Sequence, residues 1–222
     1  WRRVSSGFPQ KVEWRMTGTS DWNAGAEVVQ EEGPGPVYNF TSRLSPLPPD
    51  ARVEYRVLSA DLILGRGIFH TAKDSESANP LKVWVLGDSG SGKREQYHVL
   101  NAMAKHTATP DAKTEIDLML HVGDMAYSHG TEGEFDGRFF RPYSEMLAHL
   151  PCWPAIGNHE IKSSDVETES GPYFDAFILP MAGEGGGAPR GTAVYYSFDN
   201  GPVHFIALDS SGGDIAADSE LI

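Results

Sequence analysis

Three oxygen-bearing side chains in this sequence each stand directly after a glycine at the end of a short apolar run. They are Asp88, Asp124 and Asn158. A glycine before each of them lets the chain turn sharply. In open α/β sheets, ligands bind outside the carboxyl ends of the strands, so we expect the three side chains to converge in one crevice. Carboxylates that converge without a counter-charge repel each other. A cation relieves this cost, so the pattern predicts a metal site.

The first of these turns also resembles a nucleotide-binding loop. The stretch from Gly87 to Lys93 nearly matches the phosphate-cradling pattern G-x-x-x-x-G-K-[ST]. However, Arg94 stands where that loop needs a Ser or Thr hydroxyl for magnesium. Asp88 would also place a negative charge where phosphate must bind. We therefore favour a metal-site turn over a nucleotide loop, and a glycine turn without any function remains an alternative.

The amino-terminal third of the chain predicts β structure. Val12–Met16 and Val53–Val57 alternate apolar and polar residues, which is the period of half-buried strands. Turn-forming residues lie between such runs, at Gly33–Pro36 and Ser45–Asp50. Short strands at this spacing favour a small β-sandwich. We assign residues 1–72 to this domain and the polar, proline-ended residues 73–80 to a linker.

The sequence pattern of residues 81–222 predicts an α/β layered domain. The buried runs Val83–Leu86, Ile116–Val122 and Cys152–Ile156 alternate with helix-like segments. Tyr195–Phe198 and Val203–Leu208 predict a hairpin in the same sheet. The apolar residues that share one helical face are Phe139, Tyr143, Met146, Leu147 and Leu150. Pro142 fits the first turn of that helix better than its middle.

The composition excludes several classes of protein. Of 222 residues, 40% are hydrophobic and 22% are charged, which is typical of a globular chain. The net charge of −13 and the absence of a basic run argue against a nucleic-acid partner. No run is long enough to cross a bilayer, so we expect no membrane partner. Cys152 is the single cysteine, which allows no internal disulfide, and its neighbours predict a buried hydrophobe.

The turns and their surroundings together resemble the purple acid phosphatases of the calcineurin-like metallophosphoesterase superfamily. Gly87–Gly90, Gly123–Tyr127 and Gly157–Glu160 are similar to the motifs G-D-x-G, G-D-x-x-Y and G-N-H-[DE]. Tyr196–Ser210 is similar to the strand pair that follows in that family. The amino-terminal β region resembles the family's fibronectin-like domain. Three motifs in order are specific, whereas any one alone would be weak.

The resemblance implies a role for each site residue. Asp88 and Tyr127 would bind Fe³⁺, Asp124 would bridge two metals, and Asn158 would bind a divalent ion: Zn²⁺, Mn²⁺ or Fe²⁺. His159 would be catalytic, contacting the substrate phosphate together with Asn158 and helping to protonate the leaving group. Gly90 stands where most metallophosphoesterases have a histidine, and a tyrosine phenolate is a hard donor that suits a trivalent ion.

Each of these residues alone has a plainer interpretation. Aspartate and asparagine favour turns, and Tyr127 alone would usually be a core aromatic. The combined motifs favour the metal site. His121 and His204 lie on or beside apolar strands and are interpreted as structural. His98 and His129 lie near the presumed site loops, where substrate contact is the alternative to the plainer interpretation that we favour. Lys93 and Arg94 could attract phosphate, and a solvated surface is an equal alternative.

The sequence departs from the family pattern after Asn158. The family's later motifs V-x-x-H and G-H-x-H, which supply three metal ligands, are absent from these 222 residues. We therefore expect a fragment clipped at both ends, with a helix beginning at Ala216–Ile222. We expect this chain alone to bind the second metal weakly and to show no substantial activity. A short chain with an incomplete site is the alternative.

The resemblance implies hydrolysis of phosphate monoesters, an acid phosphatase activity in which two metals clamp the phosphate and generate hydroxide from bound water. The phosphate ester is the expected partner. A phosphodiesterase or nucleotidase of the same superfamily is one alternative, and an incomplete metal- or phosphate-binding module is another. The resemblance also implies an extracellular or secretory location, although the chain shows no signal peptide.

Overall fold

The computed structural model describes all of the chain except residues 1, 4–9, 33–37, 108–115 and 212–222. The chain forms two compact units, Trp1–Asp74 and Ser75–Ile222. The division falls inside the range 73–80 that the sequence assigns to a linker. The helix expected at Ala216–Ile222 and the turn at Gly33–Pro36 lie outside the described residues.

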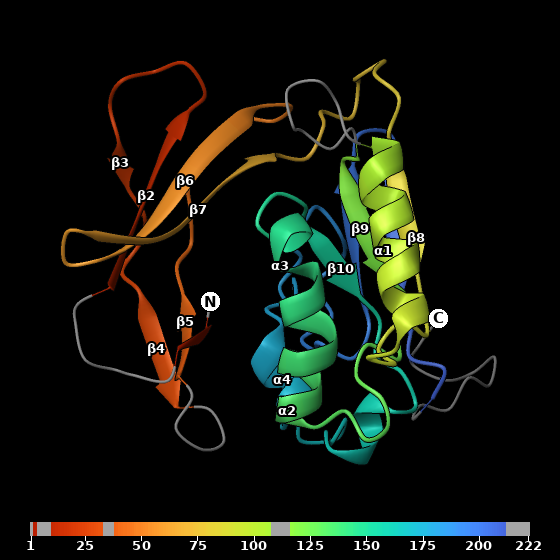
Figure 1. Ribbon diagram of the computed structural model, residues 1–222. Coiled ribbons are helices and arrows are strands. Elements are labelled where there is room, and N and C mark those ends of the chain that lie inside the picture. Colours follow the sequence, from red (N-terminus) through yellow and green to blue (C-terminus); the bar gives the residue numbers. More distant parts are fainter. Residues whose placement is uncertain (1, 4–9, 33–37, 108–115, 212–222) are drawn as a thin grey trace. The chain divides into compact units, whose positions relative to one another are not determined.

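The first unit contains two antiparallel sheets (Figure 1), with strand orders β3-β2-β6-β7 and β1-β5-β4. Its strands are β1 (Arg2–Arg3), β2 (Gln10–Met16), β3 (Asn23–Ala24), β4 (Val29–Glu32), β5 (Tyr38–Thr41), β6 (Arg52–Ser59) and β7 (Leu62–His70). The alternation is confirmed within the predicted runs, where Val12 and Trp14 on β2 and Val53 and Val57 on β6 are buried. It ends at Val57, because Leu58 and Ser59 are buried too and the register of β6 against β7 shifts there. Apolar burial on alternate positions is what holds these strands in register.

The second unit is built on a parallel sheet of order β10-β9-β8, formed by β8 (Val83–Leu86), β9 (Leu118–His121) and β10 (Cys152–Pro154). Their parallel pairing places all three carboxyl ends at one edge. Helix α1 (Arg94–Thr107) connects β8 towards β9, and a second helical run precedes β10 (Figure 1). This is the layered α/β arrangement that the alternating sequence pattern predicts.

The helical run before β10 changes type along its length. It begins as α2 (Glu132–Glu134), widens into the π-helix η1 (Phe135–Phe140) and continues as α3 (Arg141–Leu147). Phe139 and Tyr143 are fully buried on it, as the predicted face requires. Pro142 occupies the first turn of α3, where its missing N–H is tolerated. π-helical turns inside longer helices are frequent near functional sites.

The carboxy-terminal hairpin corrects one expectation. β11 (Tyr196–Asn200) and β12 (Val203–Ala207) pair antiparallel as predicted, but they form a separate two-stranded sheet rather than joining β10. The hairpin attaches through side chains instead of a backbone ladder. Phe198 stacks on Trp153 with ring centroids 3.8 Å apart, and the Tyr196 hydroxyl donates to the carbonyl of Pro154 at 2.7 Å.

Two short helical turns complete the described part of this unit: η2 (Glu160–Lys162) and α4 (Pro172–Ala176). The core joins the sheet to the helices through Trp84, Leu118, Met119 and Tyr143. No helix in the described ranges is long and apolar enough to cross a membrane.

Candidate metal centre

The carboxyl ends of β8 and β9 carry two aspartates in an uncommon backbone conformation. Asp88 has φ 53° and Asp124 has φ 59°. Residues other than glycine keep a left-handed backbone conformation only where surrounding contacts hold them in it, and such residues are frequent at functional sites. Here the two loops hold each other: the Asp88 N–H donates to the Gly123 carbonyl at 3.2 Å, and the Gly90 N–H donates to the Asp124 carbonyl at 3.1 Å.

Glycine is required where these loops meet. A β-carbon on Gly90 would fall on the backbone carbonyl of Met125. The residue that replaces a histidine in the motif therefore also allows the loop after β8 to lie directly on the loop after β9. This close approach brings the Asp88 and Asp124 side chains to one site.

Tyr127 completes the cluster with a phenol. Its hydroxyl donates to Asp88 Oδ1 at 2.5 Å. Burial raises the pKa of Tyr127, and the Asp88 and Asp124 carboxylates raise it further, so the phenol is protonated when no cation is present. The phenol proton of Tyr127 therefore lies close to the carboxylate oxygens, and a metal cation in its place would relieve the repulsion between those oxygens. The donor set, carboxylate plus phenol, fits a hard metal ion.

His159 faces the same cluster. Its Nδ1 lies 2.7 Å from the Ser128 carbonyl oxygen and 3.0 Å from Lys162 Nζ. Nε2 is 3.9 Å from Asp124 Oδ2. The imidazole ring also packs edge-on against Tyr127, with centroids 4.4 Å apart. A proton acceptor and donor is thus held beside the carboxylates in one orientation.

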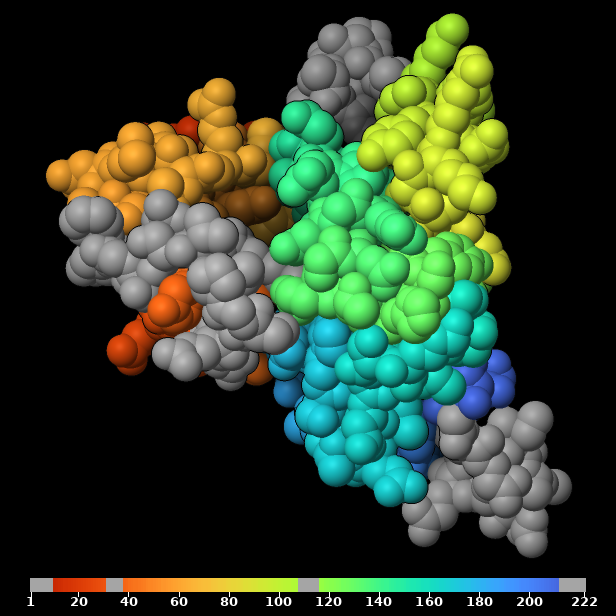
Figure 2. All heavy atoms as spheres, turned by 60° about the horizontal axis from the view of Figure 1, so that its bottom comes forward, coloured from red at the N-terminus to blue at the C-terminus, as the bar shows by residue number. Residues whose placement is uncertain are grey.

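Asn158 lies at the end of the loop after β10 and is exposed. It lines a cavity of about 450 Å³ together with Asp88 and Asp124, and the lining also includes the aromatic residues Trp153 and Phe198. Figure 2 brings this end of the unit forward, where the green segment after β9 meets the cyan segment after β10. The structure therefore brings all five predicted site residues to one end of the sheet.

Sequence reasoning missed the residues that hold the Tyr127 loop. Glu134 accepts the N–H groups of Ser128 at 2.6 Å and of Thr131 at 3.1 Å, and Arg138 donates to the Tyr127 carbonyl. The signal was present in the sequence, since Thr131 and Glu134 have the spacing of a capping box. These contacts fix the backbone from which the phenol projects.

Sequence reasoning also gave no role to two residues on the other side of His159. Glu160 is fully buried and accepts the N–H of Asp124 at 2.7 Å. Burial raises the pKa of Glu160, while the backbone N–H bonds oppose the rise. Lys162 donates from Nζ to the Ser128 carbonyl at 3.0 Å, beside the His159 ring. Glu160 is the fourth residue of its motif, but nothing in the sequence marks Lys162.

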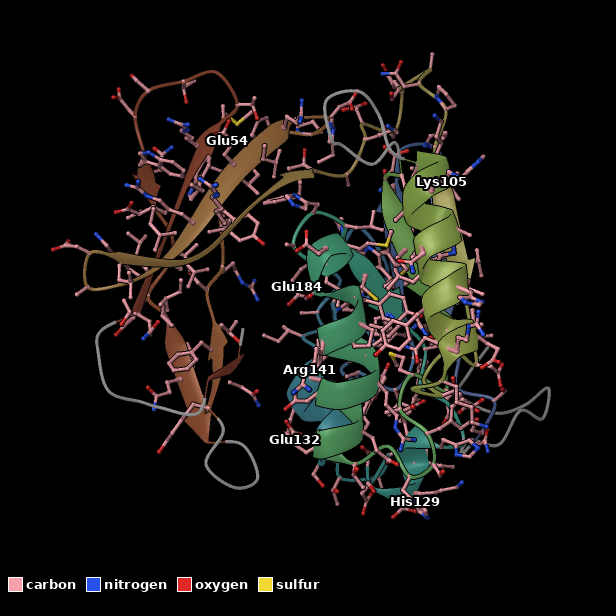
Figure 3. The ribbon with its side chains drawn as sticks, in the orientation of Figure 1. Glu54, Lys105, His129, Glu132, Arg141 and Glu184 are labelled. Carbon is pink, nitrogen blue, oxygen red and sulfur yellow. The ribbon has the colours of Figure 1, made fainter. Side chains whose placement is uncertain are left out.

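The four other histidines that the sequence analysis considered differ in their surroundings. His121 is buried, bonds Ser89 at 2.8 Å and packs edge-on against Phe139. His204 pairs with Asp199 at 2.6 Å on the hairpin, and His98 accepts from the Arg94 guanidinium at 3.0 Å. His129 is exposed at the lower end of the unit in Figure 3. Lys105 is at the opposite end of the unit in that view.

Within the described ranges, no group of three or more His, Cys, Asp or Glu side chains forms a metal-binding cluster. The site here has two carboxylates, and its other predicted ligands are a phenol and an amide. Cys152 contributes no ligand: it is packed against the core, and burial raises the pKa of its thiol to about 12. The cysteine is therefore protonated and inert at neutral pH.

The fold and the site together consist of a parallel α/β sheet with hard oxygen donors at its carboxyl edge. The model of the calcineurin-like phosphoesterase family matches residues 81–210. The chain belongs to this family of hydrolases, whose members generally bind divalent metals.

Two curated relatives come from Arabidopsis thaliana. One, named "Probable inactive purple acid phosphatase 24", is 27% identical over 200 residues, covering 79% of this chain and 30% of the relative. Another, "Purple acid phosphatase 23", is 26% identical over 162 residues, covering 60% of this chain and 31% of the relative. The chain thus spans about 30% of the length of these relatives.

Among solved structures, "Structure of PhoD" superposes with a TM-score of 0.52 at 16% identity. The match covers 91% of this chain and 45% of that chain. At this identity the likeness concerns the fold alone.

Proposed function

We propose that the whole protein hydrolyses phosphate monoesters with a binuclear metal centre, as an acid phosphatase. The observation that carries the proposal is the cluster of Tyr127, Asp88 and Asp124, in which a protonated phenol lies 2.5 Å from one carboxylate. Phenolate, carboxylate and amide oxygens are hard donors. A trivalent ion would replace the phenol proton, because its charge reverses the repulsion that keeps the proton in place.

The proposed allocation of ligands is the one that the family resemblance implies. Asp88 and Tyr127 would hold Fe³⁺, Asp124 would be shared, and Asn158 would contact a divalent ion such as Zn²⁺, Mn²⁺ or Fe²⁺. When bound, two such ions would supply the positive charge that metal-dependent hydrolysis of a phosphate ester needs. A neutral amide and a shared carboxylate hold a divalent ion weakly without nitrogen donors. The second ion therefore needs further ligands from the whole protein.

The residues of this chain would orient the ester and move one proton. The Ser128 carbonyl contacts Nδ1 of His159, and Nε2 lies 3.9 Å from Asp124 Oδ2. An imidazolium there can donate a proton to the leaving-group oxygen. The exposed Asn158 amide lies on the same cavity and can donate to a phosphate oxygen.

The amino-terminal unit is proposed to be a fibronectin-like domain, with boundaries at residues 1–72 and a linker at 73–80. Its two antiparallel sheets of four and three strands support this. A secretory location is proposed on the family resemblance alone.

A second candidate is a catalytically incomplete metal- or phosphate-binding module. It is favoured by the name of one relative, "Probable inactive purple acid phosphatase 24". Such a module would bind phosphate or metal without turnover.

Parallel assays of a chromogenic phosphate monoester and diester test the proposal. The whole protein should prefer the monoester, lose activity with a chelator and regain it with Fe³⁺ and Zn²⁺. Asp124→Asn should lose activity, whereas Asp165→Asn, in an exposed loop, should keep it. A preference for the diester would favour the phosphodiesterase alternative. Absence of turnover with metal bound would favour the module.

A further inference from the structure

The Glu160 carboxylate joins the two loops that carry the proposed metal ligands. Its Oε2 accepts the N–H of Asp124 at 2.7 Å and the N–H of Gly157 at 3.0 Å, and its Oε1 accepts the N–H of Ala126 at 3.1 Å. Two of these donors belong to the loop after β9 and one to the loop after β10. Glu160 has no exposed surface. A buried carboxylate thus satisfies three backbone donors from both loops.

The loops after β9 and β10 lie in direct contact, which leaves space for no side chain other than that of Glu160 between them. A β-carbon on Gly123 would stand 2.9 Å from the Cα of Gly157, and one on Gly157 would stand 2.6 Å from Glu160 Oε2. The backbones therefore touch on one side, and the carboxylate fills the space on the other. Neither loop can shift without breaking at least one of its bonds to Glu160.

The same network reaches the side chain of Asp124. The N–H of Asp124 is held by Glu160, and its Oδ1 accepts the N–H of His159 at 3.1 Å. Asn158 lies between Gly157 and His159, whose N–H groups both belong to this network. The proposed shared ligand and the proposed ligand of the second metal are therefore fixed relative to each other through Glu160.

We propose that Glu160 is a positioning residue that sets the placement of Asp124 relative to Asn158, and thereby the affinity of the metal centre. The inference rests on the proposed function for its metal part only. Glu160 itself lies behind the ligand loops and touches neither substrate nor reacting atoms. Groups that orient metal ligands change affinity by about 10- to 100-fold when they are replaced.

Glutamine cannot reproduce this arrangement. An amide has one oxygen and one NH₂ group, whereas three N–H donors converge on both oxygens of Glu160. In one orientation the NH₂ group faces the Ala126 N–H, and in the other it faces the N–H groups of Asp124 and Gly157. At least one donor is left unpaired in the interior either way.

The test compares Glu160→Gln with Asp165→Asn. Asp165 is a matched control, because it also accepts two backbone N–H groups, from Glu167 at 2.9 Å and Thr168 at 3.0 Å, but within its own exposed loop. Two quantities are measured in the whole protein. One is amide hydrogen exchange at Asp124, Ala126 and Gly157 without metal. The other is the dissociation constant for Mn²⁺ alone.

In Glu160→Gln we expect exchange at Ala126, or at Asp124 and Gly157, to be faster by roughly tenfold or more. The Mn²⁺ affinity should fall by about 10- to 100-fold. Asp165→Asn should change neither quantity. If Glu160→Gln does not fold, Glu160→Asp serves in its place, because it keeps both oxygens one methylene further back.

Wild-type exchange or wild-type Mn²⁺ affinity in the folded variant would overturn the proposal. Equal losses in Asp165→Asn would overturn it as well, because the effect would then be general. If the wild type takes up no Mn²⁺, the proposed metal site is wrong. Amide exchange at the three positions then tests the positioning role by itself. Loss of protection in Glu160→Gln supports that role, and wild-type protection in Glu160→Gln refutes it.

Discussion

Tyr127 is the residue that most sharply separates this site from a plain cluster of carboxylates. Its phenol is held against Asp88, and the neighbouring anions keep it protonated while no cation is bound. The sequence predicted its importance from one motif position. The residues that aim it, Glu134 and Arg138, belong to a helix start that sequence reasoning did not connect to the site.

Tyr127→Phe should therefore remove a colour rather than the fold. If the phenolate binds Fe³⁺, the wild-type protein should absorb visible light by charge transfer from phenolate to metal. The variant should lose this band and keep its circular dichroism spectrum, since only the phenol oxygen is deleted. A variant that keeps the band would remove Tyr127 from the ligand set. Tyr97→Phe, on the exposed surface of α1, is the control.

His121 should make the stability of the protein depend on pH. Burial lowers the pKa of its imidazole to about 4, and the Asp88 carboxylate opposes this only in part. The unfolded chain binds a proton near pH 6.5, so the unfolded state takes up more protons as the pH falls from about 6.5 to 4. Stability present above pH 6.5 should be lost across that window, by about 3 kcal/mol in total.

Urea unfolding at several pH values tests this contribution. His121→Gln should flatten the fall in the free energy of unfolding between pH 6.5 and 4 relative to the wild type. His129→Gln, at an exposed position, should leave the slope unchanged. Identical slopes in the wild type and His121→Gln would show that His121 is not the titrating group.

At the scale of elements, the sequence predicted where the strands lie more accurately than it predicted which strands pair in one sheet. Alternation identified β2 and β6, and the three apolar runs identified the parallel strands, because burial pattern is a local property. The hairpin was assigned to the wrong sheet, because pairing is decided by side-chain packing far along the chain, here Trp153 on Phe198. The π-helical segment left no readable pattern.

The contact between the ligand loops depends on glycine at position 157. Gly157→Ala would place a methyl group 2.6 Å from Glu160 Oε2, and closer still to the Asp124 backbone, so we expect a loss of about 1–3 kcal/mol in stability. Gly137→Ala is the matched control, because nothing lies within 4 Å of its β-carbon and the residue is helical. It should be neutral or stabilising by up to about 1 kcal/mol. Thermal unfolding distinguishes the two, and equal melting temperatures would contradict the close approach.

At the scale of the whole molecule, the sequence indicated two units, and the chain divides between Asp74 and Ser75. The change from alternating to continuous apolar runs made this visible. Convergence of the site was predictable because parallel strands end at one edge. The burial of the individual site residues could not be predicted from the sequence. Asp124 is buried whereas Asp88 and Asn158 are exposed, and this difference depends on how the loops pack on each other. The resemblance to a fibronectin-like domain stays a proposal.

The central claim, that this cluster holds metal used for catalysis, is tested most directly by the metal content and turnover of two variants. Asp124→Ala removes the proposed shared ligand, so elemental analysis should find metal lost together with activity. His159→Ala should keep most of its metal while kcat for a phosphate monoester falls by about 10²- to 10⁴-fold, the range for loss of a general acid. Equal metal loss in both variants, or full metal content in Asp124→Ala, would contradict the account.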